Sequence, residues 1–214
     1  MKKPSVTIVD YGRGNLFSVS RAFEQTGAAV VTTDDIGAIA NAQRLVVPGV
    51  GAFGDAMAEL SARKLVEPLQ RFAITGRPML GLCVGMQIFF ESGEEFGKHP
   101  GLGLLPGRVI AIAGQRDAPL KIPHIGWNRL VPSVSWNNTI LSGLDKNAYC
   151  YFVHSFAAAP ENFDDLLAQT RYGDILLTAA VQKGNLWGCQ FHPEKSGPIG
   201  LKIISNFLDL PAHQ

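Results

Sequence analysis

The chain passes from an apolar strand into a helix over Pro78–Gln87, which reads P-M-L-G-L-C-V-G-M-Q. The apolar run before Cys83 predicts a strand over Met79–Leu82, and the residues after it predict a helix. The G-x-C-x-G formed by Gly81, Cys83 and Gly85 matches a nucleophile elbow with sulfur in place of a hydroxyl oxygen. Side chains at the glycine positions would collide with the turn or the substrate. Because a helix N-terminus brings partial positive charge to the sulfur, the arrangement favours a thiolate nucleophile.

Strand and helix patterns alternate through the first half of the chain, which is typical of a parallel sheet covered by helices. Strands are expected at residues 5–10, 30–33, 44–47 and 79–82, with a helix after Asn15 and a long helix over 55–74 that has Pro68 as a candidate break. The second half predicts β-runs at 108–113, 121–131, 148–156, 166–171, 175–182 and 186–191, a hairpin turn at 183–185, and a last helix over 197–208. The expected fold is α/β, with a mostly parallel central sheet flanked by helices and extra antiparallel strands in the C-terminal half. Residues 1–214 are expected to form a single domain.

Composition narrows the class of protein. The 214 residues include 19 Lys and Arg against 18 Asp and Glu, a net charge of +1, so electrostatics give no support for nucleic-acid binding. Three cysteines do not make a disulfide framework and fit a reducing compartment. The apolar segment after the basic N-terminus is too short for a signal peptide, and nothing approaches the roughly 20 apolar residues of a membrane span. A soluble, cytoplasmic protein without membrane contact is therefore expected.

A cysteine nucleophile needs a base and a group that orients the base, and His192-Pro193-Glu194 can supply both. Pro193 favours an extended backbone at His192. Residues two apart in an extended segment point to the same side, so Glu194 can reach one imidazole nitrogen and leave the other for sulfur. The preceding apolar run puts the pair at a strand's C-terminal end, where open α/β sheets carry their sites.

Stabilisation of a tetrahedral oxyanion needs N–H donors close to the sulfur. One donor is the N–H of Val84, directly after the nucleophile. A second is expected from the glycine-rich loop Gly49-Val50-Gly51, which follows the 44–47 strand and lets the backbone approach a ligand closely.

Each of these features also has a simpler interpretation. A lone cysteine after an apolar strand is more often a buried small hydrophobe, His192-Pro193-Glu194 alone is more often a strand terminus, and Gly49–Gly51 alone is a turn. Together they supply nucleophile, base, orienting carboxylate and oxyanion donors at one sheet edge, which favours a catalytic site. Cys150 and Cys189 lie in apolar runs and are expected to be inert core thiols. The sequence has neither a C-x-x-C motif nor a cluster of Cys and His, so a metal site is not expected. No cofactor is expected either.

With these motifs in place, the chain resembles the class I, triad-type glutamine amidotransferases, and the resemblance covers nearly the whole length. The matching segments, in the family's order, are Pro48-Gly49-Val50-Gly51, Gly81–Gln87 and His192-Pro193-Glu194. The resemblance implies a flavodoxin-like fold and thiol attack on the side-chain amide of L-glutamine. Cys83 would be the nucleophile, His192 the acid and base, and Glu194 its orienting group.

Further segments resemble one branch of that family, the glutaminase subunits of imidazole glycerol phosphate synthase. These segments are Ile8–Leu16, Pro123–Asn128, Tyr151–Ser155 and His192–Gly197. The resemblance implies that Gln87, Glu95, Ser155 and Phe156 line the glutamine site, Phe156 replacing the tyrosine of many relatives. It also implies a heterodimer with a (β/α)₈ synthase subunit that receives the ammonia, with Asn15, Trp127 and Lys195 at the interface.

Two alternatives stay open from the sequence. One is the glutaminase subunit of another synthase, such as anthranilate synthase. The other is a non-glutaminase cysteine hydrolase or a binding subunit on the same fold. All three triad residues are present, which favours an active enzyme over a binding subunit.

Overall fold

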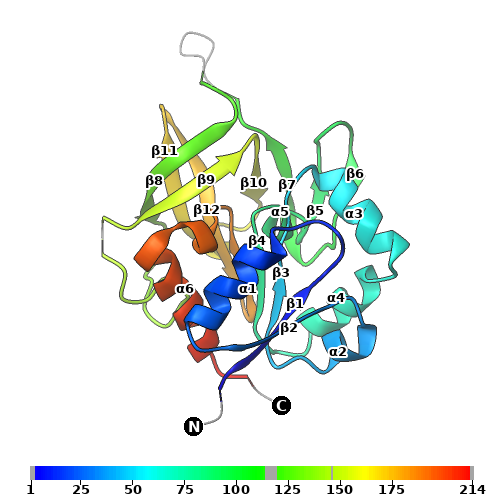
Figure 1. Ribbon diagram of the computed structural model, residues 1–214. Coiled ribbons are helices and arrows are strands. Elements are labelled where there is room, and N and C mark those ends of the chain that lie inside the picture. Colours follow the sequence, from blue (N-terminus) through cyan, green and yellow to red (C-terminus); the bar gives the residue numbers. More distant parts are fainter. Residues whose placement is uncertain (1–2, 114–119, 146, 213–214) are drawn as a thin grey trace.

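The computed structural model describes residues 3–113, 120–145 and 147–212. Its centre is a nine-stranded mixed sheet in the order β2-β1-β3-β4-β13-β12-β11-β8-β9 (Figure 1). The bounds are β1 Ser5–Val9, β2 Ala29–Thr33, β3 Leu45–Val47, β4 Met79–Leu82, β8 His124–Pro132, β9 Tyr149–His154, β11 Leu166–Tyr172, β12 Ile175–Lys183 and β13 Leu186–Cys189. Neighbours from β2 to β13 are parallel and those from β13 to β9 antiparallel, which confirms the predicted mixed sheet.

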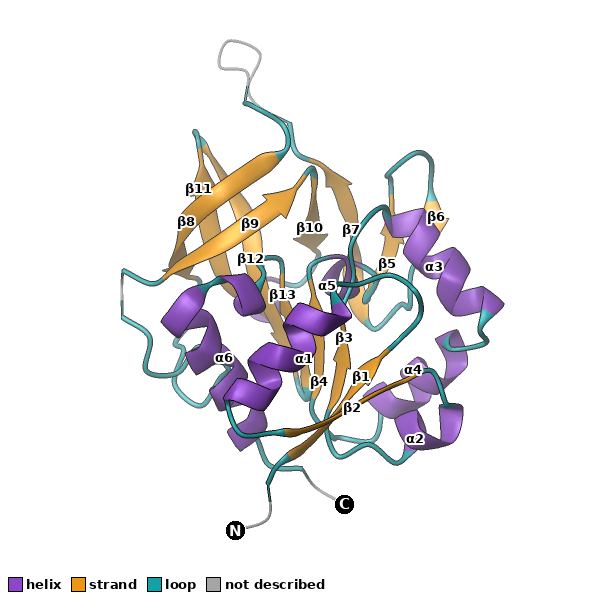
Figure 2. Ribbon diagram, in the orientation of Figure 1, coloured by secondary structure: helices purple, strands orange, loops and turns teal. Residues whose placement is uncertain are grey.

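Helices cover both faces of the parallel half, as the alternating sequence pattern predicts (Figure 2). They are α1 Leu16–Gln25, α2 Ile36–Ala40, α3 Phe53–Ala62, α4 Val66–Ala73, α5 Val84–Gln87 and α6 Gly197–Asp209, with 3₁₀ turns at Phe163–Asp165 and Pro193–Lys195. One core contains α1 and α6, which meet at Phe23 and Phe207, and the other contains α2, α3 and α4. Neighbouring strand residues divide between the cores: Ile8 joins the first and Val9 the second.

The predicted long helix over 55–74 is wrong in one respect, because the break does not lie at Pro68. Helix α3 ends at Ala62, and Lys64 takes a left-handed φ of 58°. The N–H groups of Lys64 and Leu65 then donate to the carbonyls of Ser61 and Leu60, the bonding pattern of a Schellman cap. Pro68 instead occupies the first turn of α4, where helix N–H groups have no intrahelical partner.

The predicted strand over 148–156 divides at Ser155, where the chain leaves the large sheet. Its continuation, β10 Phe156–Pro160, belongs to a second sheet of order β10-β7-β5-β6 that the sequence patterns do not predict. The other members are β5 Phe90–Gly93, β6 His99–Pro100 and β7 Leu105–Ala111. The hairpin turn is present, since Lys183 pairs with Leu186 across Gly184-Asn185. Among the described residues, no helix combines the length and apolar character that crossing a bilayer requires.

Candidate functional site

Cys83 forms a strained turn between β4 and α5. Its φ is 54° and its ψ −114°, a conformation that residues other than glycine rarely adopt. The flanking glycines are needed for backbone contact within the turn. A Cβ on Gly85 would lie 1.8 Å from the carbonyl oxygen of Val47, and one on Gly81 would lie 2.6 Å from that of Gly85. The elbow therefore fits only because three backbone segments meet without side chains between them.

Helix α5 is shorter than the elbow pattern suggests, with only the four residues Val84–Gln87. A single turn carries a much smaller summed dipole than a long helix, so the dipole contributes less than predicted to thiolate stabilisation. Most of the electrostatic support for the sulfur must come from side chains and individual N–H groups.

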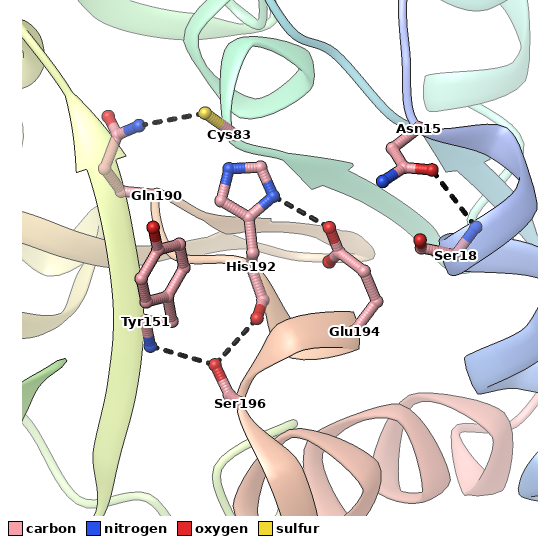
Figure 3. A network of polar contacts seen from close by, with 8 residues as sticks. All are labelled: Asn15, Ser18, Cys83, Tyr151, Gln190, His192, Glu194 and Ser196. Carbon is pink, nitrogen blue, oxygen red and sulfur yellow. Dashed lines mark hydrogen bonds and ion pairs between the residues drawn. The ribbon is translucent and has the colours of Figure 1, made fainter. Parts of the chain in front are cut away.

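The predicted contact between His192 and Glu194 is present, and Figure 3 shows it beside Cys83. Imidazole Nδ1 lies 2.8 Å from Glu194 Oε1, and the two side chains are 6% and 2% exposed. The other ring nitrogen, Nε2, is buried and makes no hydrogen bond among the described residues. The ring therefore has one nitrogen fixed by the carboxylate and one left free on the side of the cavity.

The surroundings of His192 favour its protonated form. Burial lowers its pKa, but the neighbouring sulfur of Cys83 and the carboxylate of Glu194 outweigh burial and raise the pKa to about 10. A positive imidazolium next to the sulfur stabilises a thiolate, and it also carries the proton that a leaving amine requires.

A cavity of about 450 Å³ opens over this group. Its lining includes Cys83, Val84 and His192, which come from the ends of β4 and β13. Cys83 is 5% exposed, so the thiol meets the outside only through this cavity. A small polar molecule that enters the cavity can thus reach sulfur and imidazole together.

Three of the four predicted oxyanion residues line the same cavity, and Gly49 does not. Val50, Gly51 and Val84 line it, and Gly51 has a φ of 89°. In the described part of the chain, no hydrogen bond occupies the N–H groups of these three residues. Gly49 packs against the elbow, where a Cβ would lie 2.5 Å from the N of Gly85.

All four residues predicted for glutamine binding also line the cavity: Gln87, Glu95, Ser155 and Phe156. One carboxylate oxygen of Glu95 accepts the N–H of Phe53 at 2.8 Å, which fixes this acid at the rim. Gln87 is 3% exposed, and its amide nitrogen donates to the carbonyl of Phe156 and to Gln190, both at 3.0 Å. Its donors are therefore used inside the protein, and its carbonyl oxygen is what remains for a ligand.

The three residues predicted for a partner interface are exposed, and one of them, Lys195, lines the cavity. Trp127 is 53% exposed, and its ring lies 6.1 Å from that of Tyr151. Lys195 lines the cavity and places Nζ 6.0 Å from the same Tyr151 ring. Asn15 is also exposed and caps α1 by accepting the N–H of Ser18.

Known proteins that resemble this chain agree with the geometry. The family model described as "Glutamine amidotransferase class-I" matches residues 7–210. The chain belongs to the class-I glutamine amidotransferases. Within them it belongs with the HisH subunits of imidazole glycerol phosphate synthase. It is 47% identical over 211 residues to subunit HisH 1 of Legionella pneumophila strain Lens, covering 96% of this chain and 99% of the relative. It is 44% identical over 208 residues to HisH of Syntrophotalea carbinolica, covering 96% and 100%.

Solved structures support the fold. The structure of PurLQS from Thermotoga maritima matches with a TM-score of 0.71 at 21% identity, covering 97% of this chain and 99% of that one. A crystal structure of another glutamine amidotransferase matches with a TM-score of 0.71 at 17% identity, covering 95% of this chain and 99% of that one. The predicted class I glutamine amidotransferase fold is thereby confirmed.

Three side chains at the site of this amidotransferase were not predicted from the sequence. Tyr11 is fully buried and donates its hydroxyl to the carbonyl of Pro48 at 2.6 Å, which anchors the start of the Gly49–Gly51 loop. Burial, followed by the proximity of Cys83, raises the pKa of Tyr11. Gln190 lies against the sulfur, with Nε2 3.7 Å from Sγ. The alternation that pairs His192 with Glu194 also places Gln190 on that side, and it is the signal that could have identified this residue.

His154 is the third of these residues and forms a buried pair with His124. Its Nδ1 lies 2.9 Å from the carbonyl oxygen of Phe156, and its Nε2 lies 2.9 Å from Nδ1 of His124. Burial is the largest cause that lowers the pKa of His154 to about 4, aided by the nearby His124 and His192 rings. His154 is therefore neutral at physiological pH, and burial also lowers the pKa of His124.

The other two thiols of the amidotransferase differ from Cys83. Burial raises the pKa of Cys150 to about 12 and raises that of Cys189 well above its ordinary value. Both are fully buried in the core that contains α1 and α6. Within residues 3–113, 120–145 and 147–212, no three His, Cys, Asp or Glu side chains group as metal ligands would.

We predict that the elbow conformation stores strain that glycine releases. Cys83→Ala and Cys83→Gly both remove the thiol, but only glycine adopts φ 54° without steric cost. The Gly variant should have a free energy of unfolding about 1 kcal/mol above the Ala variant, since the strain of one such residue exceeds the added chain entropy of glycine. Chemical denaturation of the pair measures the difference, and an Ala variant at least as stable as the Gly variant would show that the strain does not exceed the chain entropy of glycine.

His154 should make the protein sensitive to mild acid. Its folded pKa of about 4 lies below the unfolded value of about 6.5, so only the unfolded chain takes up this proton as the pH falls between them. The stability that it contributes is present above pH 6.5 and lost towards pH 4, to a limit of about 3 kcal/mol. The raised pKa of His192 acts above this window, so it does not offset the loss. The free energy of unfolding, measured by denaturation at several pH values from 4 to 7, should fall more steeply with falling pH in the wild type than in His154→Gln. The same pH dependence in both proteins would show that His154 does not have a lowered pKa in the folded state.

Proposed function

We propose that this chain is the glutaminase subunit of an imidazole glycerol phosphate synthase and hydrolyses L-glutamine to glutamate and ammonia. The observation that carries the proposal is the convergence of Cys83, His192 and Glu194 at one cavity in a chain 44–47% identical to HisH subunits over nearly its full length. The names of these relatives favour the imidazole glycerol phosphate pathway of histidine biosynthesis over an anthranilate synthase partner. The intact Cys-His-Glu set favours turnover over a binding role.

The chemistry follows from the site. The thiolate of Cys83 attacks the side-chain amide carbon of glutamine, and the carbonyl oxygen becomes an oxyanion facing the N–H groups of Val84 and the Gly49–Gly51 loop. His192 donates its proton to the departing nitrogen, which leaves as ammonia, and a thioester remains on sulfur. A water molecule, deprotonated by His192, then attacks the thioester and releases glutamate. Glu194 keeps the imidazole ring oriented through both steps.

The substrate residues divide the recognition of glutamine between its two ends. Glu95 carries a carboxylate at the rim that can pair with the α-ammonium group. Gln87, held by its two donated hydrogen bonds, directs its carbonyl oxygen to the amide end. Ser155 and Phe156 can supply backbone contacts from the bend between the two sheets, so the replacement of tyrosine by Phe156 would cost only a hydroxyl contact.

The loop at Gly49–Gly51 is suited to control by a partner. A displaced oxyanion donor costs about 10²–10³ in rate, and glycines permit such displacement at little conformational cost. We infer that a (β/α)₈ synthase subunit docks over Asn15, Trp127 and Lys195, aligns this loop when it binds its own ligand, and takes the ammonia directly. We further infer that residues 1–214 act as one glutaminase domain. We place the domain in the cytoplasm, where its three free thiols would stay reduced.

Cys83→Ala should abolish ammonia production from glutamine, because no other side chain at the cavity can form the thioester. The assay compares wild type and variant, each with and without the purified synthase subunit of about 250 residues and its ligand. The wild type should be stimulated strongly by the complete mixture. Co-purification of the variant with the synthase subunit would show that it is folded, and ammonia release by that complex would refute the assignment.

Trp127→Glu should remove most of the stimulation by the synthase subunit. A charge in place of an aromatic side chain that becomes buried in the complex weakens binding by about 100-fold or more. Phe163→Glu is the matched control, because Phe163 is an exposed aromatic residue, at 81%, that lies outside the cavity lining and the predicted interface. Titration of each variant with the synthase subunit measures the effect. Equal loss in both variants, or none in Trp127→Glu, would place the interface elsewhere.

A further inference from the structure

Gln190 makes a side-chain contact with the sulfur of Cys83 that the triad does not explain. It is fully buried just beyond the end of β13, and its Nε2 lies 3.7 Å from Sγ. The imidazole of His192 also interacts with this sulfur, so the Gln190 amide adds a second polar contact to it. Figure 3 shows the amide and the imidazole approaching Cys83 from different directions.

A chain of hydrogen bonds fixes which end of the Gln190 amide faces the sulfur. The carbonyl oxygen of Phe156 can only accept, so the groups directed at it from His154 and Gln87 must both be N–H donors. The amide nitrogen of Gln87 then donates its second hydrogen to Oε1 of Gln190. Because that oxygen is engaged, the Nε2 of Gln190 is the end that meets the sulfur.

We propose that Gln190 is a positioning residue for the nucleophile, which orients the sulfur of Cys83 and stabilises its thiolate through an amide N–H. This role rests on the proposed glutaminase function and adds a donor to it that comes from neither the triad nor the oxyanion loop. A hydrogen-bond donor favours the charged form of its acceptor. The short helix α5 makes this support more important, because its dipole is small.

The other groups near the sulfur cannot replace this donor. His192 contributes positive charge and its own contact with the sulfur, from a direction different from that of the Gln190 amide. The hydroxyl of Tyr11 is committed to the carbonyl of Pro48. Loss of the Gln190 amide would therefore leave His192 as the remaining side-chain partner of the sulfur among these groups.

Alkylation of Cys83 by iodoacetamide tests the role without requiring glutamine turnover. The rate is measured against pH in the full chain, with labelling of the Cys83 peptide followed by mass spectrometry. Two variants lack the N–H donor: Gln190→Leu, and Gln190→Met, whose sulfur can still accept weakly from Gln87. In both, the pH of half-maximal rate should rise by about one pH unit relative to wild type, a tenfold change in the thiolate equilibrium, while the limiting rate at high pH does not fall, because a thiolate of higher pKa is the stronger nucleophile.

Gln70→Leu is the matched control, because it removes an amide that donates to the Leu102 carbonyl away from the site. Gln70→Leu should have the same pH of half-maximal alkylation rate as the wild type. Superimposable profiles for Gln190→Met and wild type would overturn the proposal. So would a fall in the limiting rate without a shift along the pH axis, which would mean that Gln190 only packs the site.

Should Gln190→Leu fail to fold, Gln190→Met alone decides. Since alkylation reads the thiol directly, failure of the glutaminase assignment would appear in the ammonia assay and leave this result interpretable.

Discussion

The parallel pairing of β4 with β13 is the constraint on which the site depends. Leu82 pairs with Cys189, and the N–H of Cys83 donates to the Cys189 carbonyl at 2.7 Å. One strand thus delivers the proposed nucleophile and its neighbour delivers the proposed base to the same sheet edge. Gln190 and Cys83 meet there although 107 positions separate them in the chain. A slip of this register by one residue would turn every side chain of β13 to the other face and separate His192 from the sulfur.

Close backbone packing lets this edge hold a strained residue. The elbow packs against the Val47 carbonyl at Gly85 and against the backbone of Gly49. The hydroxyl of Tyr11 donates to the neighbouring Pro48 carbonyl. Relaxation of Cys83 to an ordinary φ would disrupt these contacts, whose combined energy exceeds the cost of one unfavourable backbone conformation. The Gly49–Gly51 loop, the proposed source of oxyanion donors, is part of the same packing. Nucleophile geometry and oxyanion geometry are therefore set together.

Local patterns in the sequence predicted what local chemistry determines. The G-x-C-x-G elbow, the cap at Asn15 and the His192–Glu194 contact each depend on residues within a few positions of one another. The features that the sequence did not predict depend mainly on contacts between residues far apart in the chain. The bend at Ser155 and the second sheet depend on β7, and no periodicity within 148–156 reveals that partner. The α3 break needed a left-handed Lys64, a residue type without preference for that conformation. Tyr11 was missed because its partner, Pro48, lies 37 positions away.

The backbone of His192 is hydrogen-bonded to β9 at Tyr151. Its N–H donates to the carbonyl of Tyr151 at 2.9 Å. The hydroxyl of Ser196 donates to the His192 carbonyl at 2.7 Å and accepts the N–H of Tyr151 at 3.0 Å. Ser196 is 1% exposed, so water cannot replace these bonds without opening the core. The ring of Tyr151 lies 6.1 Å from that of Trp127 and 6.0 Å from Nζ of Lys195, so β9 links the proposed base of the triad to the proposed docking surface. A displacement of β9 that keeps these three bonds must carry His192 with it.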